Sequence, residues 1–329
     1  MRVLVTGGAG FIGSHVSEAL LQRGHDPFIV DNLSTGSRLN LVEEIPLFNI
    51  DICNGVELAR VFDSVQPDWV CHHAAQISVS RSMRDPCFDA EVNVIGLLNV
   101  LENAARVGVR KVIFASSGGV LYGEVTSPAN EVTPAQPISP YGISKWVGER
   151  YLEFYTRERG LRGVALRYSN VYGPRQNPSG EAGVIANFSR RMLAGEQTTI
   201  NGDGRYVRDY LFVKDAARAT VLALETELQQ AFMPINIGTG RGLAVNEVAE
   251  LIRSEVQIIW DSSGRTGIIP TCKFGIPRSG DVRSNVLLPD QATRILNWQP
   301  EVSLECGVRQ TVEWFANTDY PSTAGESMQ

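Results

Sequence analysis

The chain has 329 residues and a formal net charge of −6 at pH 7, with 43% hydrophobic and 20% charged residues. This length allows one large or two modest domains, and the hydrophobic fraction is ordinary for a globular protein with a sizeable core. No basic block suggests nucleic acid, no apolar run approaches a membrane span of about 20 residues, and the N-terminus enters a strand at once, which leaves no room for a signal peptide.

Apolar strand-like runs alternate with helical patterns through the first half of the chain. The expected strands are 2–6, 27–30, 46–49, 69–72, 111–116 and 163–168, and the expected helices lie near 12–23, 56–64, 89–107 and 141–159. Repeated βα units predict an α/β fold of the Rossmann type, a doubly wound parallel sheet with helices on both faces. Such sheets bind ligands at the carboxyl ends of their strands.

After about residue 170 the alternation becomes irregular, and Gly and Pro become frequent. This change predicts a smaller, discontinuous α/β domain that binds substrate, with one strand, 234–237, returning to the main sheet. We expect a cofactor-binding domain at 1–170 with returning segments about 205–240, and a substrate domain at 171–204 and 241–316. The polar residues 317–329 are expected to be disordered.

The first predicted strand runs into a glycine-rich turn and then a helix. Gly8, Gly10 and Gly13 fit G-x-G-x-x-G, and Gly7, Gly10 and Gly13 fit G-x-x-G-x-x-G. Either pattern removes Cβ atoms where a pyrophosphate would meet backbone N–H groups at a helix N-terminus. Asp31 ends the next strand, 18 residues past Gly13, where a carboxylate bonds an adenosine ribose and would repel a 2′-phosphate. NAD is therefore favoured over NADP, although a turn aspartate is the alternative for Asp31.

Two further motifs carry chemistry. Tyr141 and Lys145 are four residues apart and would share one face of a helix. A phenol titrates near pH 10, and a lysine together with an oxidised nicotinamide would lower that pKa. Ser116 and Ser117 follow an apolar strand, so their hydroxyls would face the same crevice. The alternatives are an incidental surface pair and a turn serine.

These elements occur in one order, and with further segments the chain resembles the extended short-chain dehydrogenase/reductase superfamily. More closely it resembles the NAD-dependent nucleotide-sugar epimerases of the UDP-glucose (UDP-galactose) 4-epimerase type. The matching segments are 6–15, 31–36, 73–76, 139–145, 167–175, 201–210, 236–240 and 298–300. Together with the last helical pattern they extend to about residue 315, nearly the whole chain.

The resemblance implies NAD-dependent C4 epimerisation of a UDP-hexose through a transient 4-keto sugar, with NAD held tightly throughout. Tyr141 would be the base on the 4-hydroxyl, Lys145 would bond the nicotinamide ribose, and Ser117 would hold the 4-oxygen. Ser116 is the alternative to Ser117, because the loop that follows is one residue longer than in the commonest form. Gly118 and Gly119 stand where dehydratases carry Asp-Glu, which favours epimerisation. A catalytically silent NAD-sensing regulator is the alternative of another class.

The resemblance also implies which residues hold each ligand. Those expected at NAD are Gly7, Gly10, Phe11, Ile12, Gly13, Asp31, Asn32, Ser34, Thr35, Gly36, Asp51, Ile52, His73, Ala74, Ala75, Gln76, Asn93, Ser116, Tyr141, Lys145 and Tyr168. Those expected at the UDP-sugar are Ser78, Ser117, Gly118, Gly119, Asn170, Arg175, Gly183, Val184, Phe188, Asn201, Arg208, Arg278, Asp281 and Asn285. Asn170, Arg208 and Arg278 would hold the diphosphate, and Asp281 would meet the uridine ribose.

The sugar itself is less defined. Asn285 occupies a position that gates bulk in the family, and its small size suggests tolerance for UDP-N-acetylhexosamines. UDP-N-acetylglucosamine and UDP-glucuronic acid 4-epimerases are therefore alternatives, with Ser78, Arg81 and Arg175 as candidates to meet a uronic carboxylate.

Family members commonly dimerise through two helices, here about 89–107 and 141–159, so a homodimer is expected. The five scattered cysteines, which include no C-x-x-C pair, favour a reducing cytoplasmic setting, and the four histidines show no metal-ligand spacing.

Overall fold

The computed structural model describes residues 1–178, 183–277 and 282–318. Its larger sheet has seven parallel strands in the order β10-β6-β5-β4-β1-β2-β3. Their bounds are β1 Arg2–Thr6, β2 Asp26–Val30, β3 Leu47–Phe48, β4 Trp69–His72, β5 Lys111–Ser117, β6 Arg162–Tyr168 and β10 Phe232–Ile237. The predicted Rossmann-type sheet and the returning strand at 234–237 are both confirmed.

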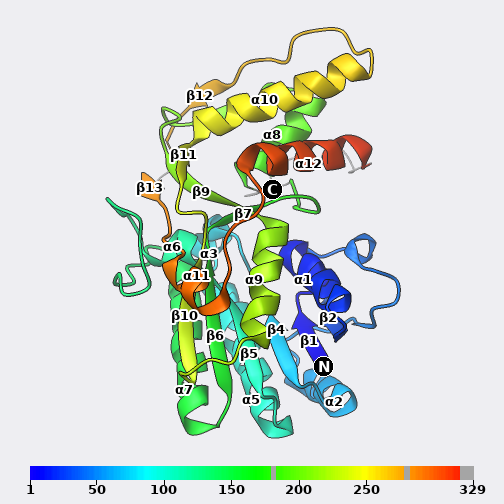
Figure 1. Ribbon diagram of the computed structural model, residues 1–329, viewed down its shortest axis with the longest axis vertical. Helices are drawn as coiled ribbons and strands as arrows, with labels where there is room; N and C mark the ends of the chain where they lie inside the picture. The colour runs from blue at the N-terminus through cyan, green and yellow to red at the C-terminus, as the bar shows by residue number, and fades with distance from the viewer. Residues whose placement is uncertain (179–182, 278–281, 319–329) are drawn as a thin grey trace.

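Helices cover both faces of this sheet (Figure 1). On one face, α1 (Phe11–Gln22) packs against α9 (Val213–Glu225); on the other lie α2 (Gly55–Val65), α5 (Gly96–Val107) and α7 (Pro140–Glu158). Successive residues of a strand point to opposite faces, so Val3 and Val5 join the core under α1 while Leu4 joins the core under α2 and α5. We call this sheet with its helices the first lobe.

The helix expected at 89–107 is built in three parts. A short helix α4 (Pro86–Ala90) passes into a π-helical turn at Glu91–Ile95 and then into α5. Shorter elements complete the first lobe: a 3₁₀ turn at Arg38–Asn40, α3 (Val79–Arg84) and α6 (Gly118–Leu121). A π turn inside a helix often marks a functional position, and this one contains Asn93.

The second lobe is smaller and is assembled from separate segments. Four short strands form one sheet: β7 (Asn170–Tyr172), β9 (Val207–Phe212), β11 (Gly242–Ala244) and β13 (Ser284–Asn285). A two-stranded sheet joins β8 (Thr199–Asn201) to β12 (Lys273–Gly275). The helices α8 (Val184–Leu193), α10 (Val245–Ser262) and α12 (Leu304–Asn317) pack around a separate apolar core.

The chain passes between the lobes more often than the sequence suggested. The returning segment was expected from about residue 205, but β9 pairs with β7, β11 and β13, so the return begins only at α9. In the opposite sense, α11 (Asp290–Leu296) and the fully buried Trp298 pack on the first lobe, where the indole nitrogen donates to the Asp215 carbonyl at 3.0 Å.

Of residues 317–329, which were predicted to be disordered, the structure describes only 317 and 318. Asn317 ends α12, and 319–329 lie outside the described residues. No helix in the described part of the chain is long and apolar enough to cross a membrane.

Candidate active site

The glycine turn lies between β1 and α1, and each of its glycines is required for a different structural reason. Gly7 has φ +68°, and a Cβ there would lie 2.5 Å from the Ala74 nitrogen. A Cβ on Gly13 would lie 2.2 Å from the Gly7 carbonyl oxygen, so Gly13 lets α1 approach the turn. Gly10 caps α1 without any side-chain hydrogen bond, and its Cβ would meet only the Gly7 oxygen at 3.1 Å. The first turn of α1 thus keeps backbone N–H groups for an anion, as a dinucleotide pyrophosphate requires.

Asp31 closes this turn from the end of β2. Its carboxylate accepts hydrogen bonds from Ala9 N at 2.9 Å and Leu33 N at 2.8 Å. Burial raises the pKa of Asp31, and these backbone donors oppose the rise. Asn32 donates to Asp51 at 2.8 Å and accepts from Ser34 N, which joins the loops after β2 and β3. The ribose and adenine side of the predicted site is therefore one connected surface.

A buried polar cluster fixes the loop after β4. Asn93 accepts from Gln76 N at 2.8 Å and donates to Gln76 O at 2.9 Å, and it also contacts Ser144 at the start of α7. Asp89 accepts from the Gln76 side chain at 2.8 Å. Asn93 acts here on the loop backbone, so its predicted contact with NAD would be indirect.

The two serines at the end of β5 are now distinguished. Ser116 is buried and donates to Glu149 on α7 at 2.6 Å. Ser117 lies at the N-terminus of α6, and its hydroxyl is close enough to Tyr141 to oppose the rise in the pKa of that phenol. This geometry favours Ser117 as the hydroxyl beside the reacting sugar and gives Ser116 a structural contact.

Tyr141 and Lys145 lie on the first two turns of α7, which begins with Ser139 as its cap and Pro140 in the first turn. Burial raises the pKa of Tyr141 to about 12, although the neighbouring Ser117 hydroxyl opposes the rise. Burial also lowers the pKa of Lys145 to about 8. The Lys145 nitrogen donates to Ala115 O at 2.9 Å and lies 5.8 Å from the centre of the Tyr141 ring.

Burial is therefore the largest influence on the pKa of Tyr141; it outweighs the opposing effect of Ser117, and the Asp89 carboxylate adds to the rise. The expected lowering by Lys145 together with an oxidised nicotinamide stays a prediction. The positive charge of an oxidised nicotinamide would act in the opposite direction.

The second lobe brings further predicted residues to this place. A Cβ on Gly119 would lie 3.7 Å from Ser117 Oγ and 3.9 Å from Asn170 Oδ1, so these three residues converge. Asn285 is fully buried and donates to Gly118 O at 3.1 Å, while its amide oxygen has no partner among the described residues. Arg208 pairs in register with Asn285 between β9 and β13.

His73 follows β4, and its ring stacks on Tyr168, with centroids 6.4 Å apart. Both His73 nitrogens are buried without a hydrogen-bond partner in the described part of the chain, and burial lowers the pKa of His73 to about 4. A neutral, unsatisfied imidazole at a strand end fits a ligand that supplies a partner. The Tyr168 hydroxyl instead bonds to Thr220 at 2.6 Å, so only the rest of its side chain is free to line the site.

Other predicted residues lie farther into the framework. Ser78 caps α3 by accepting from Arg81 N, and Arg81 stacks on Phe88 with its guanidinium 3.8 Å from the ring centre. Phe188 is buried in the core of the second lobe. Arg175 pairs with Glu18 of α1.

The remaining predicted residues lie at the ends of strands or helices. They are Phe11 and Ile12 in the first turn of α1, Thr35 and Gly36 after β2, Ile52 after β3, Ala74 and Ala75 after β4, Gly183 and Val184 at the start of α8 and Asn201 at the end of β8. Arg278 and Asp281 lie outside the described residues, so their assignments stay predictions.

Two buried carboxylates were not found from the sequence. Asp89 raises the pKa of Lys145 and contacts both Gln76 and Asn93. Glu149 receives two hydrogen bonds from Arg167, at 2.9 and 2.7 Å, besides that from Ser116. Asp89 and Asn93 are four residues apart on one helical face, as Lys145 and Glu149 are, and this spacing was the available signal.

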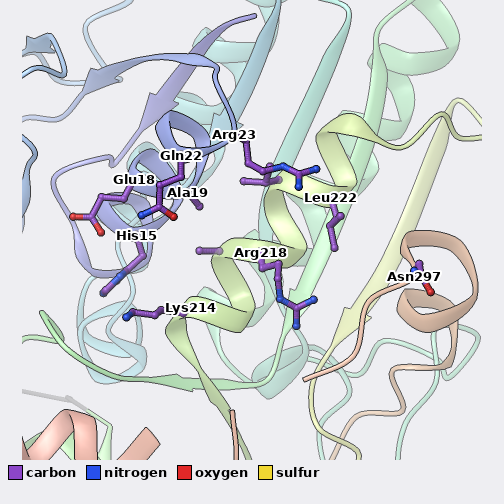
Figure 2. Close-up of a pocket in the computed structure, with 11 residues that line it drawn as sticks. His15, Glu18, Ala19, Gln22, Arg23, Lys214, Arg218, Leu222 and Asn297 are labelled. Carbon is purple, nitrogen blue, oxygen red and sulfur yellow. The ribbon is translucent and has the colours of Figure 1, made fainter. Parts of the chain in front are cut away.

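A cavity of about 480 Å³ lies between α1 and α9 (Figure 2). Its walls include His15, Glu18, Arg23, Lys214 and Arg218, and none of the predicted site residues lines it. Within the described ranges, no group of three His, Cys, Asp or Glu residues could hold a metal ion.

A glycine turn at a helix N-terminus, a carboxylate after β2 and a Ser-Tyr-Lys set at the next strand ends define a dinucleotide-dependent α/β enzyme of the short-chain dehydrogenase/reductase type. Residues 3–238 match the NAD dependent epimerase/dehydratase family, and the chain belongs to that family.

Three similar proteins are UDP-glucose 4-epimerases. The enzyme of Mycolicibacterium smegmatis is 41% identical over 323 residues, which cover 96% of this chain and 99% of that one. The Thermotoga maritima structure with UDP-glucose has a TM-score of 0.90 and 46% identity, covering 96% of this chain and 98% of that one. The Thermus thermophilus complex with NAD has a TM-score of 0.89 and 43% identity, covering 96% and 99%.

Proposed function

We propose that this chain catalyses the NAD-dependent C4 epimerisation of a UDP-hexose, with UDP-glucose and UDP-galactose as its substrates. One observation carries the proposal: Ser117, Tyr141 and Lys145 meet at the end of β5, in the same sheet edge as the glycine turn. Similarity to UDP-glucose 4-epimerases over almost the whole chain supports this choice within the family.

The chain's own residues supply binding, orientation and one proton relay. NAD⁺ held by the glycine turn and Asp31 would supply the hydride chemistry, as acceptor of the C4 hydride and as its donor to the opposite face. Tyr141 takes the proton of the 4-hydroxyl and later returns it, and Ser117, whose hydroxyl lies beside Tyr141, holds that oxygen. Lys145 keeps a positive charge beside the phenol and donates to the ribose. The glycine turn and Asp31 hold the dinucleotide in place.

The residue after Ser117 argues for epimerisation over dehydration. Gly118 and Gly119 carry no acid or base, and Gly119 lies directly beside Ser117 Oγ. Elimination of water from the sugar would need a second proton donor there. A reaction that needs hydride and one relayed proton matches the groups that are present.

A larger sugar substituent is the second candidate, supported by Asn285. Its side chain is held through its amide nitrogen on Gly118 O, and its amide oxygen is left as a buried acceptor. An N-acetyl group carries an N–H donor that could satisfy this oxygen. We therefore infer activity on UDP-N-acetylglucosamine beside that on UDP-glucose.

The test is to incubate purified protein with UDP-glucose, UDP-N-acetylglucosamine or UDP-glucuronic acid without added reductant. The product's C4 configuration is then read by NMR. UDP-galactose formed from UDP-glucose supports the proposal, and C4 inversion of the N-acetyl substrate supports the second candidate. NAD-loaded protein with no turnover of any substrate would contradict both and support an NAD-sensing regulator.

We also propose a homodimer that buries the exposed face of α7. Ile143, Trp146, Tyr151 and Phe154 are 37–48% exposed on this helix, an unusual concentration of large apolar side chains. Light scattering of the wild type should give twice the monomer mass, and Phe154→Glu should give the monomer mass. A wild-type monomer would contradict the proposed dimer.

We also propose that the protein is located in the cytoplasm. All five cysteines lie in the described part of the chain and are free, which suits a reducing compartment.

A further inference from the structure

The helix that begins with the glycine turn is tied to the second half of the molecule. Loop 173–176 follows β7 and lies against α1. Arg175 donates to Glu18 at 2.5 Å and to Ser14 Oγ at 3.3 Å. The His15 ring nitrogen Nε2 bonds the Pro174 carbonyl at 3.1 Å. These contacts join residues about 160 positions apart, and Ser14 directly follows Gly13.

The contacts between loop 173–176 and α1 are partly shielded from water. The side chains of Arg175 and Glu18 are only 20% and 26% exposed, so water screens this pair less than an ordinary surface pair. Burial lowers the pKa of His15 to about 4, so its ring is neutral at pH 7. Because a carbonyl oxygen only accepts, Nε2 carries the ring proton and donates it to Pro174.

The backbone conformation of loop 173–176 indicates that the loop is held in place. Arg175 has φ +69°, in the left-handed region that residues with a Cβ seldom adopt. Such a conformation persists where the surroundings determine it, and here the guanidinium contacts with α1 do so. Gln176, the next residue, donates to Val171 O at 3.2 Å, which closes the loop on β7.

The loop lies between the elements expected to hold the two ligands. On one side it contacts α1, whose N-terminus receives the dinucleotide. On the other, a Cβ on Gly183, the N-terminal cap of α8, would lie 3.2 Å from the Gln176 side-chain nitrogen. The start of α8 is expected to border the nucleotide of the substrate. Movement of this loop would therefore change both binding places.

We propose that Arg175 is a positioning residue that couples NAD retention to UDP-sugar binding by fixing loop 173–176 on α1. The inference rests on the proposed function for its two ligands. It replaces the sequence prediction that Arg175 meets the substrate, because the guanidinium is already engaged by Glu18 and Ser14.

We call the Arg175–Glu18 contact that holds loop 173–176 on α1 the clamp. A purely electrostatic effect of these two side chains on NAD binding predicts a different outcome from the clamp. Arg175→Gln removes a cation near the bound pyrophosphate, whereas Glu18→Gln removes an anion. If only charge mattered, the first change would weaken NAD binding and the second would strengthen it. If the clamp matters, both changes release the loop and both weaken binding.

Arg23, the C-terminal cap of α1, offers a control ion pair at the other end of this helix, with a more exposed guanidinium. It pairs with Glu225 of α9, so this bond has both partners in the first lobe. Glu18 lies on α1 and, like Arg23, lines the cavity between α1 and α9 (Figure 2). Arg23→Gln removes one ion pair from α1 without touching loop 173–176.

The experiment uses the NAD-loaded proteins Arg175→Gln, Glu18→Gln and Arg23→Gln. NAD release after dilution is followed by chromatography, and UDP binding to the loaded proteins by calorimetry. We expect both clamp variants to release NAD about fivefold faster and to bind UDP about fivefold more weakly, and Arg23→Gln to change either by less than about twofold. The charge exchange Glu18→Arg with Arg175→Glu should recover part of both effects.

Opposite effects of Arg175→Gln and Glu18→Gln, or an equal effect of Arg23→Gln, would overturn the coupling. A loss of melting temperature that is the same in all three variants, without a change in NAD release, would also overturn it. Both readouts are binding measurements, so a protein that binds NAD and UDP but does not epimerise would contradict the proposed function while leaving the coupling measurable.

Discussion

The two lobes build their parts of the site in different ways. In the first lobe each contribution comes from one short segment at a strand end, such as the glycine turn or the residues after β4. In the second lobe, β7, β9 and β13 come from positions more than 30 residues apart in the chain and meet only in the folded protein. The first arrangement suits chemistry that every family member shares, and the second suits recognition that differs between members.

Two ion pairs, one in each lobe, differ in burial. In the first lobe Glu149 and Arg167 are buried beside the site, whereas the Glu255–Arg309 pair of the second lobe is partly exposed. Buried groups have large effects on stability, because the interior screens them poorly. Breaking the first pair should therefore have the larger effect.

The largest effect should come from Tyr141→Phe. Loss of the proton relay should lower kcat by about 10³-fold, within the usual range for a general base. NAD content, measured after denaturation, should stay at the wild-type level because the glycine turn is untouched. A variant with near-normal kcat would remove Tyr141 from its assigned role.

Glu149→Ala should have the next largest effect, on stability. It leaves Arg167 buried without its carboxylate and Ser116 without its acceptor, at a cost of about 3–5 kcal/mol. Glu255→Ala, which breaks the more exposed pair in the second lobe, should cost about 1 kcal/mol or less. Urea unfolding of both variants measures the difference, and equal costs would contradict the contrast between the lobes.

Lys145→Met should stabilise the protein while it lowers activity. Burial lowers the pKa of Lys145 from 10.5 to about 8, so the folded state holds this proton less tightly than the unfolded state does. The cost of a buried charge is therefore full below pH 8, falls between pH 8 and 10.5, and is gone above that range. We expect a gain of about 1–3 kcal/mol at pH 7. Denaturation at pH 7 and 10 checks it; a gain that does not shrink with pH would exclude this cause.

The smallest effect should come from the second lobe. Asn285→Tyr should lower kcat/KM for UDP-N-acetylglucosamine about tenfold and affect UDP-glucose less, because bulk there limits the larger substrate. Asn285→Ser keeps the position small and serves as the control for loss of the bond to Gly118. Equal losses with both substrates in the tyrosine variant would show that position 285 does not select the sugar.

The contrast between the two lobes also explains which parts of the fold the sequence could predict. The parallel sheet, its returning strand and the helices α1, α2, α5 and α7 were predicted, because each produces a local apolar pattern. Helix α9, which covers one face of the sheet, was not predicted. The place of β9 in the second sheet was missed. The strands of that sheet are short, and the sequence pattern of a short strand does not indicate which other strand it pairs with.

For the site, Tyr141, Lys145 and the glycine turn were predicted, and the structure places Ser117 beside Tyr141. The sequence could not distinguish Ser117 from Ser116, because the decisive partner of Ser116 is Glu149, 33 residues away. It also could not show that Arg175 faces α1, 157 residues earlier in the chain. Nor could the sequence show the burial that raises the pKa of Tyr141, since burial is a property of the whole fold.

The burial of Trp298 on the first lobe has a consequence for synthesis. The first six strands are complete at residue 168, yet α9, β10 and Trp298 supply much of the cover for that sheet and emerge from the ribosome later. At about 5–20 residues per second, the nascent chain spends many seconds with an apolar sheet face and the β6 edge uncovered. Apolar surface exposed in this way is prone to aggregation until it is covered. The lobe that carries the catalytic residues becomes complete only when the chain is almost finished.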